Sequence, residues 1–103
     1  MERCIMSEQI SKSDTFQATS ELFKMLSSET RVSMLMALRD GPMSVGDLAN
    51  KLGLEQAAVS HQLKNMRYMS IVSATRDGRS VIYALKNPDM IELIEKARQL
   101  ADV

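Results

Sequence analysis

The sequence predicts a mainly helical domain with one β-hairpin, in the order α-α-α-α-β-β-α. Three observations predict this class. Four successive stretches carry apolar residues at helical spacing, an Asp-Gly pair separates two runs rich in β-branched and aliphatic residues, and a final amphipathic stretch follows an Asn-Pro pair. The length of 103 residues suits a single domain. We expect residues 1–13 to form a flexible tail and residues 14–103 to form the folded domain.

The first two predicted helices precede the short loop around residue 42. Asp14 can act as an N-cap with Gln17 as its capping-box partner, and residues 16–26 then place apolar side chains at helical spacing. The Ser-Ser pair at 27–28 interrupts this pattern and can cap the second helix. The Gly-Pro pair at 41–42 ends that helix, because glycine is common just past a helix and proline cannot continue it.

The next two helices are separated by a glycine. Ser44 and Asp47 have the spacing of a capping box at the start of a short helix, and Gly53 ends that helix. Residues 55–69 then form a longer helix with apolar residues at helical spacing. A short helix, a glycine-containing turn and a second helix make up the helix-turn-helix pattern.

The predicted hairpin spans residues 71–85. An Asp-Gly pair at 77–78 is a strong hairpin signal, because a type I′ turn needs positive φ at both central residues. Centring the turn on this pair predicts the following register: Ala74 opposite Val81, Val72 opposite Tyr83, and Arg76 opposite Arg79 at the tip. Two opposed arginines repel each other unless an anion lies between them.

The last helix begins at the Asn-Pro pair at 87–88, where proline is tolerated in the first turn. One face of this helix is apolar and comprises Met90, Leu93, Ile94, Ala97 and Ala101. A helix-turn-helix followed by a hairpin and a further helix predicts a mainly α domain with a β-hairpin wing, the winged helix-turn-helix architecture.

Composition excludes several classes of protein. The formal net charge is +0, yet residues 60–86 hold five basic residues against one acidic residue, which suggests one face suited to phosphates. No apolar run is long enough to span a membrane, and the single Cys4 rules out a disulfide within the chain and fits a reducing cytoplasm. No paired carboxylates, Ser/His/Asp set or glycine-rich phosphate loop is present, so we expect neither an enzyme nor a cofactor.

The helix over residues 55–69 has two different faces when wound at about 100° per residue. One face is predicted to be core: Val59, Leu63, Met66 and Met69, with Gln62 leaning toward it. The opposite face carries short polar side chains and cations, which suits base edges and phosphates of a major groove. With the hairpin, it predicts these DNA-binding residues: Gln56, Ala57, Ser60, His61, Lys64, Arg67, Arg76 and Arg79.

The predicted roles within this face differ. Gln56 and Ser60 can read bases, His61 can contact a base or a phosphate, and the longer cations contact phosphates. Three alternatives remain open. The polar face of this helix can be only a solvated surface, the basic turn of the hairpin can be only a solvated turn, and the winged helix can contact only proteins. The last would not need Ser60, Lys64 and the hairpin arginines to converge on one side.

Between Leu22 and Leu100 the chain resembles the winged helix-turn-helix repressors of the ArsR type. The resemblance rests on the segments LFKML at 22–26, ETRV at 29–32, SVGDLA at 44–49, AVSHQL at 58–63, and DGR at 77–79 before Tyr83. It implies a homodimer in which the first and last helices form the interface, and a near-palindromic double-stranded DNA operator with half-sites about one helical turn apart. The side chains predicted at this interface are Phe16, Thr19, Leu22, Phe23, Met90, Leu93, Ile94 and Ala97. Arg31 is open to two roles, a phosphate contact or a buried ion pair.

Many members of this family sense metals, and their ligand motifs do not match this chain. The Cys-x-Cys motif of the arsenic and cadmium class falls on residues 44–47, which contain no cysteine. The positions of the zinc and cobalt class on the last helix keep Asp89 and Asp102 without a histidine, a poor donor set for zinc. We therefore predict no metal site and leave the inducing signal unidentified. Cys4 is open to three roles: a free thiol, a disulfide with a second copy, or a soft-metal ligand.

Overall fold

A computed structural model describes residues 16–102 of the chain. The predicted tail, the N-cap Asp14 and Cys4 lie outside these residues. The chain divides into two compact units between Arg31 and Val32, and each unit is described by itself. In the described residues no helix is long and apolar enough to cross a membrane.

The first unit contains helix α2 (Ala18–Met25) and the turn that follows it. The turn is held by the Ser27 hydroxyl, which donates to the carbonyl of Lys24 over 2.6 Å. Arg31 Nη1 donates over 3.3 Å to the carbonyl of Met25, at the end of α2. Neither of the two roles left open for Arg31 included this contact, which satisfies a terminal carbonyl of the helix. Ser28 accepts from the backbone N–H of Arg31 over 3.3 Å, which confirms the predicted cap of the second helix.

Helix α3 (Glu29–Ala37) supplies much of the core and ends as predicted. Its buried residues are Met34, Leu35 and Ala37. A short 3₁₀ turn, η2 (Leu38–Asp40), tightens its end, and Gly41 follows with φ of 148°. Only glycine adopts such a backbone angle readily, so the chain leaves the helix at the Gly-Pro pair.

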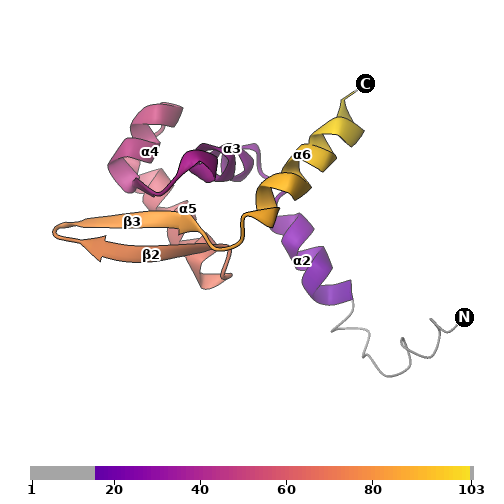
Figure 1. Ribbon diagram of the computed structural model, residues 1–103, viewed down its shortest axis with the longest axis horizontal. Helices are drawn as coiled ribbons and strands as arrows, with labels where there is room; N and C mark the ends of the chain where they lie inside the picture. The colour runs from indigo at the N-terminus through magenta and orange to yellow at the C-terminus, as the bar shows by residue number, and fades with distance from the viewer. Residues whose placement is uncertain (1–15, 103) are drawn as a thin grey trace, which may run out of the picture. The chain divides into compact units, whose positions relative to one another are not determined.

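The helix-turn-helix consists of α4 (Val45–Leu52) and α5 (Gln56–Tyr68), which contact each other (Figure 1). Ser44 caps α4 by accepting from the Asp47 N–H over 3.1 Å, as its spacing predicts. Gly53 ends α4 in the left-handed conformation with φ of 67°. Both ends of α4 are therefore set by local side-chain and backbone chemistry.

Replacing Ser44 with alanine is expected to lower the free energy of unfolding by about 1 kcal/mol, because the Asp47 N–H loses its acceptor. Urea denaturation measures this change. Asn50→Ala, at an exposed position in the same helix, serves as the control and should change stability by less than about 0.5 kcal/mol. Equal stability of the Ser44 variant and the wild type would show that the cap contributes nothing.

The sheet has three antiparallel strands in the order β1-β3-β2. The hairpin strands β2 (Val72–Asp77) and β3 (Ser80–Leu85) were predicted, whereas β1 (Met43–Ser44) was not. Strand β1 pairs Met43 with Tyr83. Two residues are too few to show an alternating pattern, so this strand has no signature in the sequence.

The predicted hairpin register is wrong by one residue at the turn. The central residues are Gly78 and Arg79, and Asp77 pairs with Ser80. Gly78 has φ of 65°, and Ser70 is the sole non-glycine residue with positive φ in the part of the chain that the structure describes. A turn with glycine at its first central position needs positive φ there alone, so Asp77 avoids a conformation that a type I′ turn would impose on it.

This correction changes the neighbours across the hairpin but not the faces of the sheet. The observed pairs are Val72 with Leu85, Ala74 with Tyr83, and Arg76 with Val81. Because each partner moves by two positions, every residue keeps its predicted face. Arg76 is not opposed to Arg79, so the expected repulsion between two facing arginines does not arise.

The core face predicted for α5 is confirmed at three of its four positions. Val59, Leu63 and Met66 are 0–1% exposed, and Gln62 is half-buried. Met69 is 39% exposed, contrary to the prediction. It follows the last residue of α5 as its C-cap, and Ser70 next to it turns the chain with φ of 64°, so helical spacing no longer applies there.

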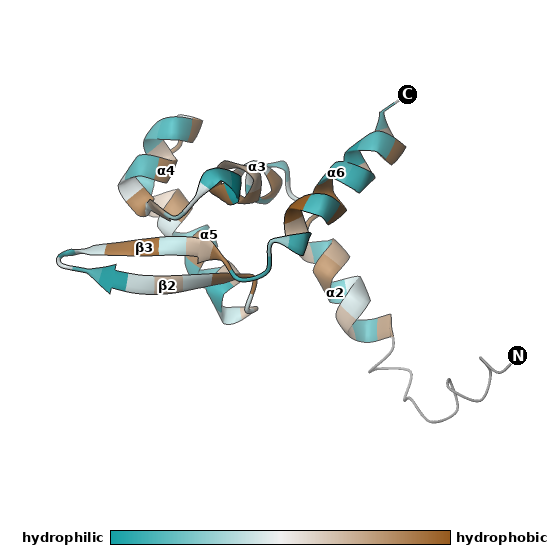
Figure 2. Cartoon of the chain, viewed as in Figure 1, coloured by the Kyte–Doolittle hydropathy of each residue, from teal (hydrophilic) through white to brown (hydrophobic). Residues whose placement is uncertain are grey.

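Helix α6 (Asp89–Ala101) begins where the sequence predicts, with the Asn87 side chain accepting from the Asp89 N–H over 2.9 Å. Arg39 of η2 forms an ion pair with Glu95 of α6 at 3.7 Å. Figure 2 shows hydrophobic and hydrophilic residues alternating around α6, as expected for an amphipathic helix. The domain is thus a winged helix-turn-helix with an additional short strand.

Candidate nucleic-acid interface

A groove of about 600 Å³ lies where α4, α5 and the wing meet. It is lined by residues 44–46, by Gln56, Ala57 and Ser60 of α5, and by residues 79–81 of the wing. The groove forms because α5 contacts α4 and β2, and α4 contacts β3. It brings together four of the eight predicted DNA-binding residues: Gln56, Ala57, Ser60 and Arg79.

The first two turns of α5 present their polar side chains on the face opposite the core. Gln56 and Ala57 are exposed and Ser60 is half-buried, whereas Val59 between them is 1% exposed. Small and amide side chains close to the helix axis suit base edges in a major groove. No acidic residue occurs between Gln56 and Tyr68, so α5 carries only neutral and basic groups.

The other predicted DNA-binding residues lie outside the groove. His61, Lys64, Arg67 and Arg76 are all exposed. His61 Nε2 and Asn65 Nδ2 are 3.5 Å apart, one helical turn from each other on α5. Sequence reasoning missed Asn65, although its spacing of four residues from His61 places it on the same face.

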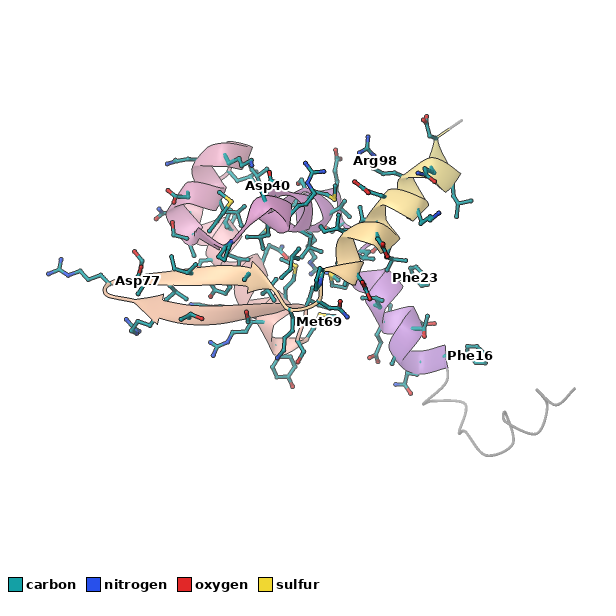
Figure 3. All side chains as sticks on the ribbon, in the orientation of Figure 1. Phe16, Phe23, Asp40, Met69, Asp77 and Arg98 are labelled. Carbon is teal, nitrogen blue, oxygen red and sulfur yellow. The ribbon has the colours of Figure 1, made fainter. Side chains whose placement is uncertain are left out.

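The wing contributes unequally through its two arginines. Arg79 occupies the turn itself and lines the groove, whereas Arg76 lies within β2 opposite Val81. Figure 3 labels Asp77 beside the tip of the hairpin, and this residue is the last of β2. The tip therefore combines a cation that faces the groove with an exposed carboxylate beside it.

The lining residues that sequence reasoning missed come from the start of α4 and from β3. From the sequence, Ser44 is assigned only to a helix cap, and Gly46 and Ser80 are not placed among the DNA-binding residues. Gly46 is the second residue of α4, and an ideal Cβ built on it would lie 2.8 Å from Gln56 Nε2. Such an approach between two helices depends on their packing, so spacing within one helix could not reveal it.

The residues predicted at a dimer interface differ in exposure. Phe16 and Phe23 are 68% and 53% exposed, and both side chains project from the same side of the α2 segment (Figure 3). On α6, Met90 and Leu93 are half-buried, Ala97 is exposed, and Leu100, which was not among the predicted residues, is 86% exposed. Ile94 is 3% exposed within the single chain, so it has little surface left for a partner. Of the remaining predicted residues, Thr19 is exposed and Leu22 is half-buried.

The described residues, 16–102, contain no group of three or more His, Cys, Asp or Glu side chains placed to hold a metal ion. Asp89 and Asp102 stand at opposite ends of α6. A helix rises 1.5 Å per residue, which separates them by about 20 Å along its axis. These two carboxylates therefore cannot ligate one ion within a single chain.

Comparison with known proteins identifies the family. The profile described as "Bacterial regulatory protein, arsR family" matches residues 28–74, which span α3, the helix-turn-helix and the start of β2. The chain is 42% identical over 72 residues to the HTH-type transcriptional regulator NmtR of Mycobacterium tuberculosis, covering 70% of this chain and 60% of NmtR. The chain thus spans less than two thirds of that relative.

Two further relatives are covered more fully. The crystal structure of the AntR antimony-specific transcriptional repressor superposes with a TM-score of 0.78 at 32% identity, covering 90% of this chain and 84% of AntR. The transcriptional activator HlyU of Vibrio cholerae is 32% identical over 79 residues, covering 77% of this chain and 73% of HlyU. The family profile, the relatives and the observed fold all agree. This chain therefore belongs to the ArsR family of bacterial regulatory proteins and is a winged helix-turn-helix, DNA-binding transcriptional regulator rather than an enzyme.

Proposed function

We propose that the protein is a homodimeric, sequence-specific repressor that reads a near-palindromic operator with α5. One observation carries the proposal: three predicted DNA-binding residues of α5, Gln56, Ala57 and Ser60, line one groove together with Arg79 of the wing. A second copy would place a second α5 in the next major groove, about one helical turn away. A winged helix that contacted only proteins would have no need of this convergence.

The contacts divide into base reading and phosphate binding. Gln56 and Ser60 lie on the exposed side of the first two turns of α5, the part of a recognition helix that enters a major groove. His61 lies at the edge of this face and is exposed. The longer cations Lys64 and Arg67 follow along α5, where they suit phosphates that flank the bases read.

The wing extends this surface beyond the helix. Arg79 lies in a two-residue turn, so its guanidinium can reach the DNA backbone or the minor groove beside α5. Arg76 is exposed on β2 and adds a further positive charge. Arg79 in the groove and the exposed cations outside it thus give this surface the chemistry needed to bind duplex DNA.

Homodimerisation is supported by apolar surface that the single chain leaves exposed. Phe16 and Phe23 lie seven residues apart around α2, and Leu93 and Leu100 lie seven residues apart on α6. Seven residues are about two helical turns, so each pair lies on one side of its segment. Large contiguous apolar patches are uncommon on the surface of a monomer and often mark an interface.

The direction of regulation is proposed as repression, released by a signal that is not yet identified. AntR is a repressor by its title, whereas HlyU is an activator by its name. Transcription in vitro from an operator-bearing promoter distinguishes repression from activation by this protein. Addition of the protein should lower transcript yield, and an increase would replace repression with activation. Repeating the measurement with metals, oxidants and reductants identifies what releases the protein.

Binding to an operator selected from a random duplex library tests the DNA-binding proposal. Four cations in each of two protomers, Lys64, Arg67, Arg76 and Arg79, give up to eight phosphate contacts. Affinity should then fall by roughly 10³- to 10⁵-fold between 50 and 200 mM salt, because bound phosphates release counterions. A titration without salt dependence, or a library that yields no preferred sequence, would leave the protein-contact module as the better interpretation.

Combining Ser60→Ala with His61→Ala is expected to weaken operator binding by about tenfold or more, with the oligomeric state unchanged. Both side chains lie on the DNA-facing side of α5, and neither belongs to the core. Lys51→Ala, exposed on α4, removes a positive charge outside this face and serves as the control. Unchanged operator affinity in the double variant would move recognition elsewhere.

A further inference from the structure

We propose that Gly46 is a positioning residue: it carries no side chain where the amide of Gln56 lies, and this lets α5 present that amide for base selection. The inference rests on the proposed DNA-reading function and adds a residue that is not itself expected to touch a base. Gly46 is half-buried in α4, and Gln56 is the exposed first residue of α5. Both residues line the groove described above.

The backbone of α4 does not require glycine at this position. The glycines with positive φ are Gly41, Gly53 and Gly78, whereas Gly46 lies inside the helix. Alanine is the better residue inside a helix, so the choice of glycine at 46 is unfavourable for α4 itself. What glycine supplies here is space.

That space is occupied by Gln56. An ideal Cβ at position 46 would lie 2.8 Å from Gln56 Nε2, closer than the roughly 3.5 Å of an ordinary contact between such atoms. The next atom, Ser44 Oγ, would be 4.0 Å away. A Cβ at 46 would therefore collide with the Gln56 amide, whereas Ser44 Oγ would be at an ordinary contact distance.

The place of this amide matters for recognition. Glutamine reads adenine by donating and accepting two hydrogen bonds at once, so the amide plane must be correctly oriented. A free glutamine loses considerable rotamer freedom when it is fixed against a base. Because position 46 has no side chain, the amide can lie beside α4 before DNA arrives, and a side chain there would force it into another rotamer.

Gly46→Ala tests the contact first without DNA. The atom it would meet is the far end of a flexible side chain, so the fold should adjust easily, with a Tm at or above that of the wild type. The ¹⁵N side-chain signals of Gln56 should shift, and the nuclear Overhauser contact between the Gln56 amide protons and Gly46 should be present in the wild type. An absent contact in the wild type, or unshifted Gln56 signals in the variant, would overturn the inference.

The second test is a double-mutant cycle on base preference. Wild type, Gly46→Ala, Gln56→Ala and the double variant are each measured against the selected operator and its three base substitutions at the position whose preference depends on Gln56. A bidentate contact corresponds to roughly fivefold to 150-fold discrimination, and Gly46→Ala should reduce it at least threefold. In the Gln56→Ala background the Gly46 substitution should change discrimination less than twofold, because there is no amide to displace.

The outcomes separate this inference from the proposed function. If the wild type shows no sequence preference, the proposed function fails and the positioning role fails with it. If the wild type discriminates through Gln56 but Gly46→Ala leaves that preference intact, the positioning role alone is overturned. An equal loss from Gly46→Ala with and without Gln56 would assign Gly46 a general structural effect and overturn it as well.

Discussion

Replacing Leu63 with alanine is expected to lower the free energy of unfolding by about 2–5 kcal/mol. Leu63 is 0% exposed and lies in the middle of α5, where its neighbours on the core face are Val59 and Met66. Alanine removes three carbon atoms and leaves a cavity that the surrounding helices and sheet fill only partly. The free energy of unfolding of a small domain is only about 5–15 kcal/mol, so this single change removes a large part of it.

Chemical denaturation followed by circular dichroism measures the loss. Lys64→Ala is the matched control: the residue is adjacent in sequence but exposed, and its replacement should change stability by less than about 0.5 kcal/mol. The two variants also separate stability from recognition, since Lys64→Ala should weaken DNA binding while leaving the fold intact. A Leu63 variant as stable as the wild type would contradict the placement of this residue at the centre of the core.

Placing charges on the exposed apolar surface is expected to convert the protein to monomers and to reduce operator affinity about 100-fold or more. The variant combines Phe23→Glu with Leu100→Glu, residues that are 53% and 86% exposed in the single chain. Because neither is buried in the core, the monomer should stay folded. Losing one of two linked DNA contacts typically costs a factor of 10²–10⁴ through the loss of effective concentration, hence an affinity fall of about that size.

Sedimentation equilibrium measures the oligomeric state, and a gel shift measures the affinity. Lys96→Glu, exposed on α6 among its charged residues, is the control for added negative charge and should stay dimeric. A double variant that sediments as a normal dimer would refute the assignment of these side chains to the interface. A monomer that binds the operator as tightly as the wild type would refute the need for a dimer.

Much of the fold is written in local patterns that the sequence shows directly. The hydroxyl of Ser44 and the backbone freedom of Gly53 bound α4, and each acts on atoms within a few residues along the chain. The faces of α5 follow from 3.6 residues per turn, which places Val59, Leu63 and Met66 together in the core. The caps of α4 and the periodicity of these three residues depend on no other part of the chain, so they were predicted correctly.

The failures occurred where two local solutions compete or where a regular pattern ends. The Asp-Gly pair is compatible with two turn positions, and the observed one confines positive φ to Gly78. Met69 continues the helical spacing in the sequence, yet α5 ends at Tyr68 and the chain turns at Ser70. Strand β1 forms by pairing with β3, and no property of its two residues predicts this pairing.

The sequence by itself determined the family, the order of the helices and the hairpin, and the residue types available for DNA. Helical periodicity and capping are short-range, so Gln56 and Ser60 could be assigned to the polar face of α5 from spacing alone. Only the tertiary structure decided which of these side chains share a groove with Arg79, and that Gln56 rests where Gly46 has no side chain. Those contacts join segments separated by loops, and they depend on how helices and strands pack, which periodicity within one element cannot specify.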